Sequence, residues 1–208
     1  MRNRLKERDS LAARHDFDAL PDSAEIEVRS ARRSELSVLA DMANRLVPGV
    51  QITEPTLDRY LAFDPECIVT FSRRDRLLGA VAFLYLNDRG HDALILDDMS
   101  LNHPDTGLLA ARSDEVSAIY VWAIAGLGRA MLGLGNVSRH LSQPRYVSAD
   151  LYAQPSSEDG RNLMIALGFE PTPSYQTELW RYKRPWNRLP IYMPASILSA
   201  GSFLDARQ

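Results

Sequence analysis

The chain has 208 residues, of which 45% are hydrophobic and 25% are charged, and its net charge is −3. This length suffices for one domain with a well-buried core, and the composition is ordinary for a soluble globular protein. The weakly acidic balance excludes a general electrostatic attraction to nucleic acid or to an anionic membrane.

The longest apolar run, residues 77–86, has about half the length that a membrane-spanning helix needs. No apolar stretch follows the charged residues 1–8, so we expect no signal peptide. The single cysteine, Cys67, lies in an apolar stretch, which is typical of a small core residue in a reducing compartment. We therefore expect a cytoplasmic protein without a membrane segment.

The first part of the chain predicts an N-terminal arm, a strand and a helix. Residues 1–23 are charged and of mixed sign, which indicates a solvated arm. Alternating apolar residues predict a short strand over 25–29. Ser34 is expected to cap the helix that follows, and Pro48-Gly49 is expected to end it.

A second helix and a hairpin come next. Apolar spacing predicts a helix over 55–63, with Pro55 in its first turn. The runs 67–72 and 77–86 predict two antiparallel strands, and Gly79 is expected to relieve crowding or to mark a bulge.

Residues 87–115 form the least regular part of the sequence. We expect residues 93–96 to form a further strand or sheet edge, and the rest to be a long acidic loop, which is usually functional or mobile. This loop and residues 47–56 are the expected acceptor loops.

The stretch from Ser117 to Leu141 organises the chain. Residues 118–125 are apolar, β-branched or aromatic, which predicts a strand buried on both faces. Gly126 and Gly128 break this strand, and a helical pattern follows them. The first turn of a helix presents free N–H groups and a partial positive charge, so this turn is a candidate phosphate site.

Two well-known phosphate motifs do not fit this turn. A dinucleotide fingerprint needs a third glycine where Met131 stands, and a P-loop needs a lysine where Leu134 follows Gly133. The glycines have a simpler explanation as well, because they allow a helix to pack closely on its sheet.

The last third predicts a strand over 146–152, a helix capped by Ser156 or Ser157 that ends at Gly168, and a strand over 176–182. We expect the domain to span residues 24–183. A proline-rich tail, 184–208, would begin extended and end in a short helix over 195–206.

Two motifs and the order of elements resemble the GNAT superfamily of acyl-CoA N-acyltransferases. Gly126 and Gly128 match its pyrophosphate loop, Q/R-x-x-G-x-G/A, although Ala123 stands at the first position. Residues 162–171 resemble its late helix, which ends in Tyr-x-x-x-Gly-Phe, with Met164 in place of the tyrosine. The resemblance implies an α/β (α+β) fold with a mixed, mostly antiparallel central sheet flanked by helices.

The resemblance also implies a function. It predicts transfer of an acyl group, most simply acetyl from acetyl-CoA, to an amine of a small molecule or peptide, with acyl-CoA as co-substrate and no metal. Two neighbouring parallel strands, at 118–122 and 146–152, would diverge to hold the thioester arm. A longer acyl donor is a variant, because Gly133, Gly135, Ala123 and Ala125 are small.

The site residues follow from the same resemblance. Glu115 is a candidate general base, with a solvated loop carboxylate as the simpler reading; Asp97 and Asp98 are alternates. Tyr152 or a hydroxyl at Ser156 or Ser157 is a candidate proton donor, because Met164 cannot donate a proton. The cofactor-binding set comprises Tyr120, Val121, Trp122, Gly126, Leu127, Gly128, Arg129, Ala130 and Ser156.

Alternatives remain open at this point. The chain is also compatible with a CoA- or ligand-binding protein without turnover, or with an interaction module whose tail forms a homodimer or holds a partner. Residues 180–186 interleave basic and aromatic side chains, a pattern that binds single-stranded nucleic acid in some proteins but also suits an edge strand. Because the chain is acidic, we expect no nucleic-acid partner.

Overall fold

A seven-stranded sheet with the order β1-β2-β3-β4-β5-β7-β6 forms the centre of the molecule. The computed structural model describes residues 16–101 and 103–185. All neighbouring strands are antiparallel except β4 and β5, which are parallel. The strands are β1 (Glu27–Ser30), β2 (Ile68–Arg73), β3 (Arg76–Leu86), β4 (Ala118–Gly126), β5 (Asp150–Ala153), β6 (Glu170–Pro171) and β7 (Trp180–Tyr182).

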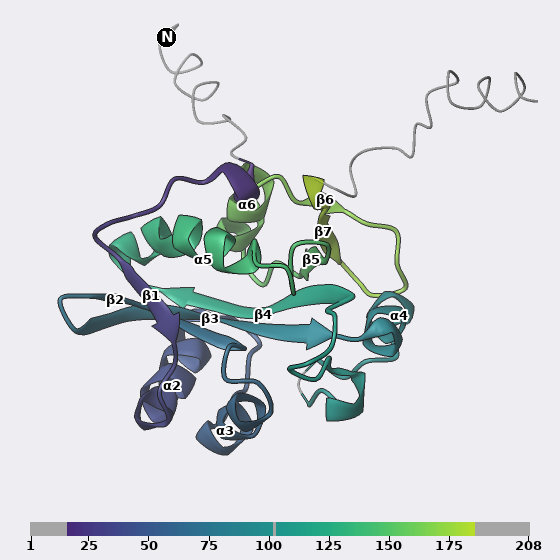
Figure 1. Cartoon of the computed structure of the whole chain (residues 1–208), viewed down its shortest axis with the longest axis horizontal. Helices are drawn as coiled ribbons and strands as arrows, with labels where there is room; N and C mark the ends of the chain where they lie inside the picture. The colour runs from purple at the N-terminus through teal and green to yellow at the C-terminus, as the bar shows by residue number, and fades with distance from the viewer. Residues whose placement is uncertain (1–15, 102, 186–208) are drawn as a thin grey trace, which may run out of the picture.

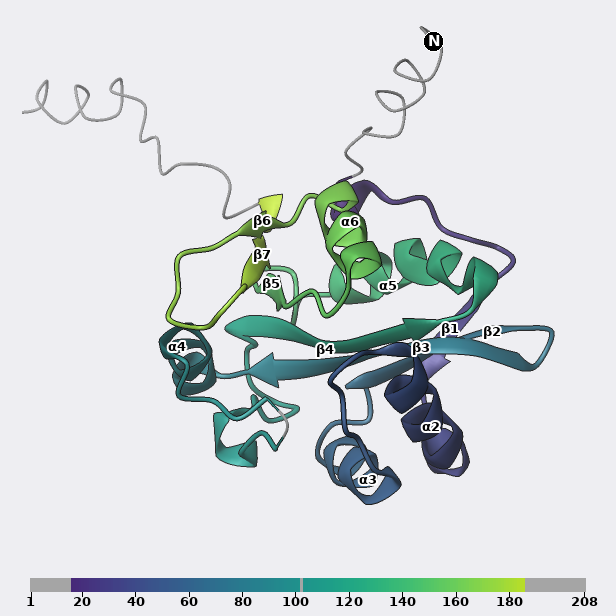
Figure 2. The same ribbon diagram turned by 180° about the vertical axis from the view of Figure 1, so that it is seen from behind.

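Helices cover both faces of this sheet (Figures 1 and 2). The first pair, on one face, is α2 (Leu36–Leu46) and α3 (Glu54–Phe63); the second pair, on the opposite face, is α5 (Leu134–Leu141) and α6 (Glu158–Ala166). A further helix, α4 (Asp88–Leu96), lies at one end of the sheet. Short 3₁₀ turns complete the fold: η1 (Phe17–Ala19), η2 (Arg33–Glu35), η3 (Thr106–Leu108) and η4 (Gly128–Gly133). The predicted fold class is confirmed.

Several local predictions are confirmed in detail. Ser157 caps α6, with its Oγ accepting the N–H of Gly160 at 3.1 Å, and Gly168 ends that helix at φ 85°. Gly79 lies beside a register shift between β2 and β3, and a β-carbon there would lie 2.3 Å from Ala125 O. Gly79 therefore both relieves crowding and marks a bulge, the two roles that the sequence suggests for it.

The strand expected over residues 93–96 is wrong, because these residues belong to α4. Asn87 caps that helix, with its Oδ1 accepting the N–H of Gly90 at 2.9 Å. The helix ends at Asp97, which adopts a left-handed conformation with φ 62°. An apolar run of four residues suits a strand or a helix equally, and here the capping asparagine decides.

The start of α2 also differs from expectation. Ser34 lies inside the 3₁₀ turn η2 and does not cap the helix. The turn is fixed by Glu35 instead, whose carboxylate accepts the Arg32 N–H at 2.8 Å and two bonds from the Arg29 guanidinium. A charged pair has replaced the expected hydroxyl cap.

Two strands are shorter than predicted. β5 begins at Asp150 and not at 146, because residues 143–149 form turns in which Gln143 O accepts the N–H groups of Tyr146 and Val147 at 2.9 and 3.0 Å. β7 begins at Trp180 and not at 176, and Glu178 before it has a positive φ of 53°.

The two ends of the described chain are fastened together. Arg184 is 1% exposed and donates to Leu141 O at 2.7 Å and to the carboxylate of Asp18. The Tyr182 hydroxyl also bonds Asp18, and Phe17 is buried in the core. The expected arm and tail thus contribute residues to the packed domain, whereas the helix expected over 195–206 lies outside the described residues.

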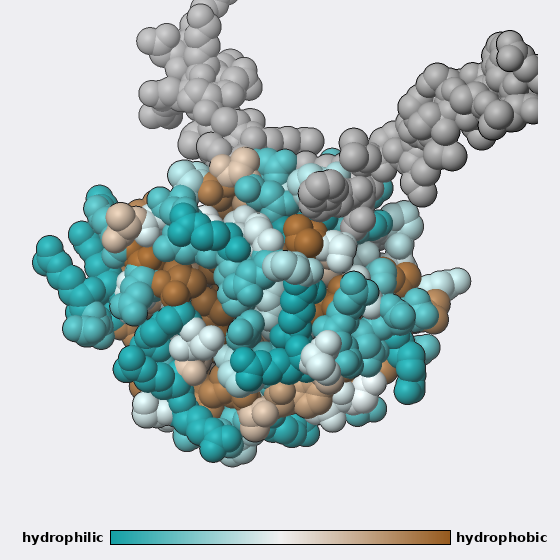
Figure 3. Space-filling model, viewed as in Figure 1, coloured by the Kyte–Doolittle hydropathy of each residue, from teal (hydrophilic) through white to brown (hydrophobic). Residues whose placement is uncertain are grey.

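The face that Figure 3 shows is mostly hydrophilic, with separate hydrophobic patches. Within residues 16–101 and 103–185, every helix is too short or too polar to cross a bilayer.

Candidate functional site

The parallel strands β4 and β5 diverge half-way along β4. They pair from Ala118 with Asp150 to Val121 with Ala153, and β5 ends there. β4 continues to Gly126 with β3 as its partner on the other side. The expected divergence is therefore present, but it begins later than the predicted strand ranges suggested. Beyond Val121, the edge of β4 that faces β5 has no strand partner among the described residues.

A bulge places Trp122 at the point of divergence. In the β3–β4 ladder, Ala82 pairs with Ala123 and Phe83 pairs with Val121, so Trp122 is the extra residue of β4. A bulge bends its strand and redirects the side chain that it carries.

The Trp122 side chain is held from two directions. Its Nε1 donates to Leu101 O at 2.6 Å, and its ring meets that of Tyr60 edge-on, with centroids 5.2 Å apart at 77°. Tyr60 is fixed in turn, because its hydroxyl donates to Pro104 O at 2.8 Å. The Trp122 side chain is therefore held in one orientation by these contacts and is not a free surface side chain.

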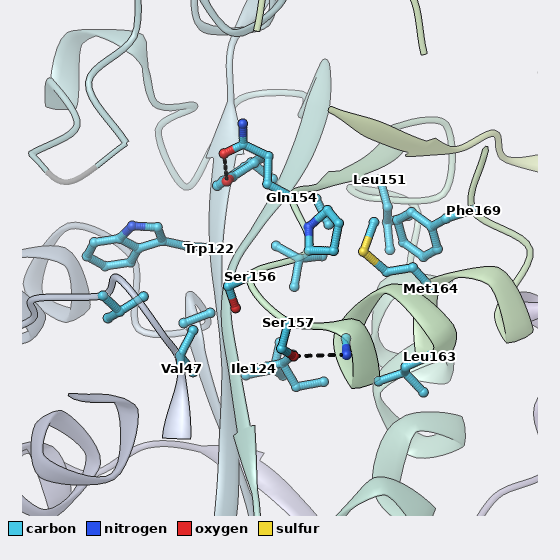
Figure 4. A pocket seen from close by; sticks show the side chains of 18 of the residues that line it. Val47, Trp122, Ile124, Leu151, Gln154, Ser156, Ser157, Leu163, Met164 and Phe169 are labelled. Carbon is cyan, nitrogen blue, oxygen red and sulfur yellow. Dashed lines mark hydrogen bonds between the residues drawn. The ribbon is translucent and has the colours of Figure 1, made fainter. Parts of the chain in front are cut away.

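A cavity of about 520 Å³ opens where the strands diverge. This volume is within the range of small-molecule and cofactor sites. Figure 4 shows its lining, with Trp122 and Val47 on one side and Met164, Leu151 and Phe169 on the other.

The residues that line the cavity come from elements on both faces of the sheet, and we name two parts of the cavity after them. We call the first the α5–α6 compartment; it is lined by Leu134, Val137, Leu163, Met164, Leu167 and Phe169. We call the second the α2 compartment; it is lined by Leu46, Val47, Pro48, Leu101 and Trp122. Ser156 lies between them in Figure 4.

Few polar groups line the cavity. The Tyr120 hydroxyl donates to Gln154 Oε1 at 3.1 Å, and Gln154 Nε2 donates to Thr177 O at 2.6 Å. These bonds connect β4, the end of β5 and the loop before β7. Burial raises the pKa of Tyr120 above its ordinary value, so this phenol stays protonated at neutral pH.

Glu178 is the one carboxylate among the described residues that line the cavity. It is exposed, and its two oxygens accept bonds from Arg161 Nη2 at 2.9 and 2.8 Å.

The glycine bend follows the end of β4. Leu127 N–H donates to Leu78 O at 2.8 Å and Ala130 N–H donates to Leu127 O at 3.2 Å, so two of the expected anion-binding amides already have backbone partners. No side chain of a described residue caps the start of η4. A β-carbon on Gly126 would lie 2.5 Å from Met131 Cε and 2.9 Å from Ala130 Cβ, so packing also requires a glycine here.

The residues predicted for the site separate into three groups. Tyr120, Val121, Trp122, Ser156 and Ser157 line the cavity. The second group, residues 126–130, forms the bend immediately after β4.

The third group lies elsewhere. Glu115 is exposed and precedes β4 at the end of the strand opposite the bend. Tyr152 is buried outside the cavity lining, with its hydroxyl 2.9 Å from His91 Nε2. Burial raises the pKa of Tyr152 and lowers that of His91. Neither Glu115 nor Tyr152 lines the cavity, and their catalytic roles stay predictions.

Sequence reasoning missed Gln154, Glu178 and Leu46, whereas Leu101 belongs to the expected acceptor loop 87–115. Residues 47–50 belong to a predicted acceptor loop and do line the cavity. The side chains that they face, Trp122 and Leu101, are distant in sequence, so spacing along the chain carried no signal for the pairing.

Gly133 and Gly135 do not create room for a longer acyl group. A β-carbon on Gly133 would lie 2.6 Å from Phe71 Cδ1, and one on Gly135 would lie 2.0 Å from Pro21 O. That expectation is wrong for these two positions, because both glycines serve close packing.

Other candidate groups prove to be structural. Trp180 and Tyr182 are 8% and 0% exposed, so neither ring is open to a nucleic-acid base, and Trp186 lies outside the described residues. Cys67 is buried, which raises the pKa of its thiol. The described residues contain no group of three potential metal ligands.

Comparison with solved structures identifies the fold. The loading GNATL domain of CurA from Lyngbya majuscula is similar at a TM-score of 0.54 and 15% identity, over 76% of this chain and 97% of that domain. The GphF GNAT-like decarboxylase in complex with isobutyryl-CoA is similar at a TM-score of 0.47 and 16% identity, over 68% of this chain and 72% of that chain. The structure of yncA, a putative acetyltransferase from Salmonella typhimurium, with acetyl-CoA is similar at a TM-score of 0.47 and 10% identity, over 80% of this chain and 98% of that chain. No protein-family model and no curated protein matches the sequence.

The chain therefore has the GNAT fold, and the resemblance that the two partial motifs indicated is confirmed at the level of the fold.

Proposed function

We propose that this protein is an acyltransferase that uses acyl-CoA, most simply acetyl-CoA, to acylate an amine of a small molecule or peptide. The observation that carries the proposal is the divergence of β4 and β5 after Val121, which opens the cavity directly before the glycine bend. The GNAT fold supports the same reading.

In this proposal the donor crosses the sheet. The pyrophosphate lies at the bend 126–130, and the pantetheine arm pairs with the free edge of β4, as a peptide pairs with an exposed strand. The arm enters from the α5–α6 compartment, since the bend leads into α5. The thioester then reaches the α2 compartment, where the acceptor meets it.

The reaction needs two proton movements. The amine nitrogen attacks the thioester carbonyl and loses a proton, the C–S bond breaks, and the departing thiolate gains a proton. Ser156 and Ser157 line the cavity, and Ser157 accepts the Gly160 N–H and so keeps its own O–H for donation. Met164 also lines the cavity but cannot donate a proton. Glu115 as base and Tyr152 as donor remain the water-mediated alternatives.

Calorimetric titration with acetyl-CoA tests the binding step. Gly128→Trp places a large side chain at the bend and should weaken binding at least about tenfold, because the phosphates and the indole compete for the same space. Gly107→Trp, in the exposed turn η3, is the matched control and should bind as the wild type does. Equal affinity for all three proteins would remove the assignment of the bend.

A second candidate is a CoA-binding protein without turnover, which Met164 at the family tyrosine position favours. Release of free CoA thiol over a panel of amines separates the two candidates. Binding without amine-dependent thiol release supports the second.

A further inference from the structure

The described residues that line the α2 compartment present apolar side chains, and none of them is charged. Its lining side chains are Leu46, Val47, Pro48, Leu101 and Trp122. The last residue of α2 and the α2–α3 loop supply the first three of these, and β4 and the loop after α4 supply the others. The bond from Trp122 to Leu101 O and the edge-on contact with Tyr60 hold the aromatic wall in one orientation.

The titratable groups in the described lining of the cavity are already bonded to other protein groups. Glu178 is beside Thr177 in the loop before β7, and Arg161 of α6 holds both of its oxygens. The Tyr120 phenol is engaged with Gln154. An ammonium ion in the α2 compartment would therefore leave water without gaining a carboxylate partner, which is costly for a charged group.

The charge state of the amine also matters for the chemistry. Only a neutral amine attacks a thioester, and an alkyl amine such as a lysine side chain is almost fully protonated at neutral pH. An aromatic amine is neutral there, because its nitrogen lone pair is delocalised into the ring. Its flat body also suits a wall made by an indole ring.

Resting on the function proposed above, we propose that the acceptor is an apolar amine, in the first place an aromatic amine, that enters the α2 compartment uncharged. Polyamines and lysine-like acceptors are excluded because the compartment offers their charge no partner.

Two isomeric amines test this point, because they match in size and differ in charge. With acetyl-CoA saturating, thiol release is measured for para-toluidine, benzylamine and the polycation spermidine between about pH 7 and about pH 9. The KM for para-toluidine should not change with pH. The KM for benzylamine should fall about tenfold for each pH unit, as its neutral fraction grows. Spermidine should show the highest KM of the three at about pH 7.

A carboxylate introduced into the compartment should reverse the preference. Val47→Asp should lower the KM for benzylamine at about pH 7 at least about tenfold and flatten its pH dependence, and it should raise the KM for para-toluidine. Val38→Asp makes the same change on the exposed face of α2 and should leave both values unchanged.

The outcomes are distinct. A lower KM for spermidine than for para-toluidine at about pH 7, a pH-independent KM for benzylamine, or an unchanged preference in Val47→Asp overturns the inference and leaves the acyltransferase proposal in place. If acetyl-CoA binds but none of the three amines releases thiol, the inference is also overturned. Failure of acetyl-CoA to bind removes both proposals.

Discussion

Gly79 lies opposite Gly126 in the β3–β4 ladder, next to the glycine bend, and its replacement by alanine tests how the sheet supports the site. A β-carbon at position 79 would lie 2.3 Å from Ala125 O and 2.7 Å from Gly126 Cα, where ordinary contacts begin at 3.4 Å. The obstructing atoms belong to the backbone, so the two strands must separate locally by about 1 Å.

The cost follows from three terms. Overpacking of this kind costs about 1–3 kcal/mol, and each weakened ladder hydrogen bond adds about 1 kcal/mol. The smaller entropy of the unfolded chain offsets about 0.4–1 kcal/mol. We expect Gly79→Ala to lower the free energy of unfolding by about 2–3 kcal/mol, measured by urea denaturation.

Two further measurements make the test specific. Gly107→Ala, whose β-carbon would meet nothing closer than 3.5 Å, should stay within about 0.5 kcal/mol of the wild type. Because Ala125 and Gly126 lead into the bend, Gly79→Ala should also weaken acetyl-CoA binding at least about tenfold by calorimetry. A variant as stable as Gly107→Ala, with full affinity, would refute the reasoning.

Three other predictions concern single side chains. Arg184→Met should lower the free energy of unfolding in urea by about 3–5 kcal/mol, because it removes a buried cation and leaves Asp18 and Leu141 O without that donor. Ser157→Ala should lower the free energy of unfolding by about 1 kcal/mol and should also lower the rate of thiol release. Ser157→Asp should restore the helix cap, and with it the stability, but not thiol release. Recovery of both in Ser157→Asp would exclude the hydroxyl as proton donor. Burial lowers the pKa of His140 below 6.5, so the histidine of the unfolded chain takes up a proton before that of the folded chain. The free energy of unfolding should therefore fall as the pH drops through 6.5, by at most about 1.4 kcal/mol per pH unit. His140→Gln should reduce that slope in urea titrations at several pH values.

The elements that could be predicted are those in which local sequence decides the structure. The run 118–125 is short, apolar and rich in β-branched and aromatic residues, which favours a buried strand, and the glycines that follow it end it where expected. The cap by Ser157 and the left-handed Gly168 are likewise local features.

Other features could not be predicted because they depend on distant partners or on balanced preferences. Residues 93–96 suit a strand or a helix equally, and only the cap at Asn87 resolves them. Val47 and Trp122 line the same side of the cavity but are far apart in sequence, and the bulge that places Trp122 there leaves no local pattern.

The contact between residues 16–18 and residues 182–184 has a consequence for synthesis. Asp18 receives two of its partners, Tyr182 and Arg184, only late in translation, because Tyr182 follows it by 164 residues. Until then Phe17 has no β7 ring to pack against, although in the finished protein its ring lies 5.6 Å from that of Tyr182. Folding of this domain is therefore completed after translation of its C-terminal strand, and a nascent chain stalled before residue 180 would expose its N-terminal segment to proteases.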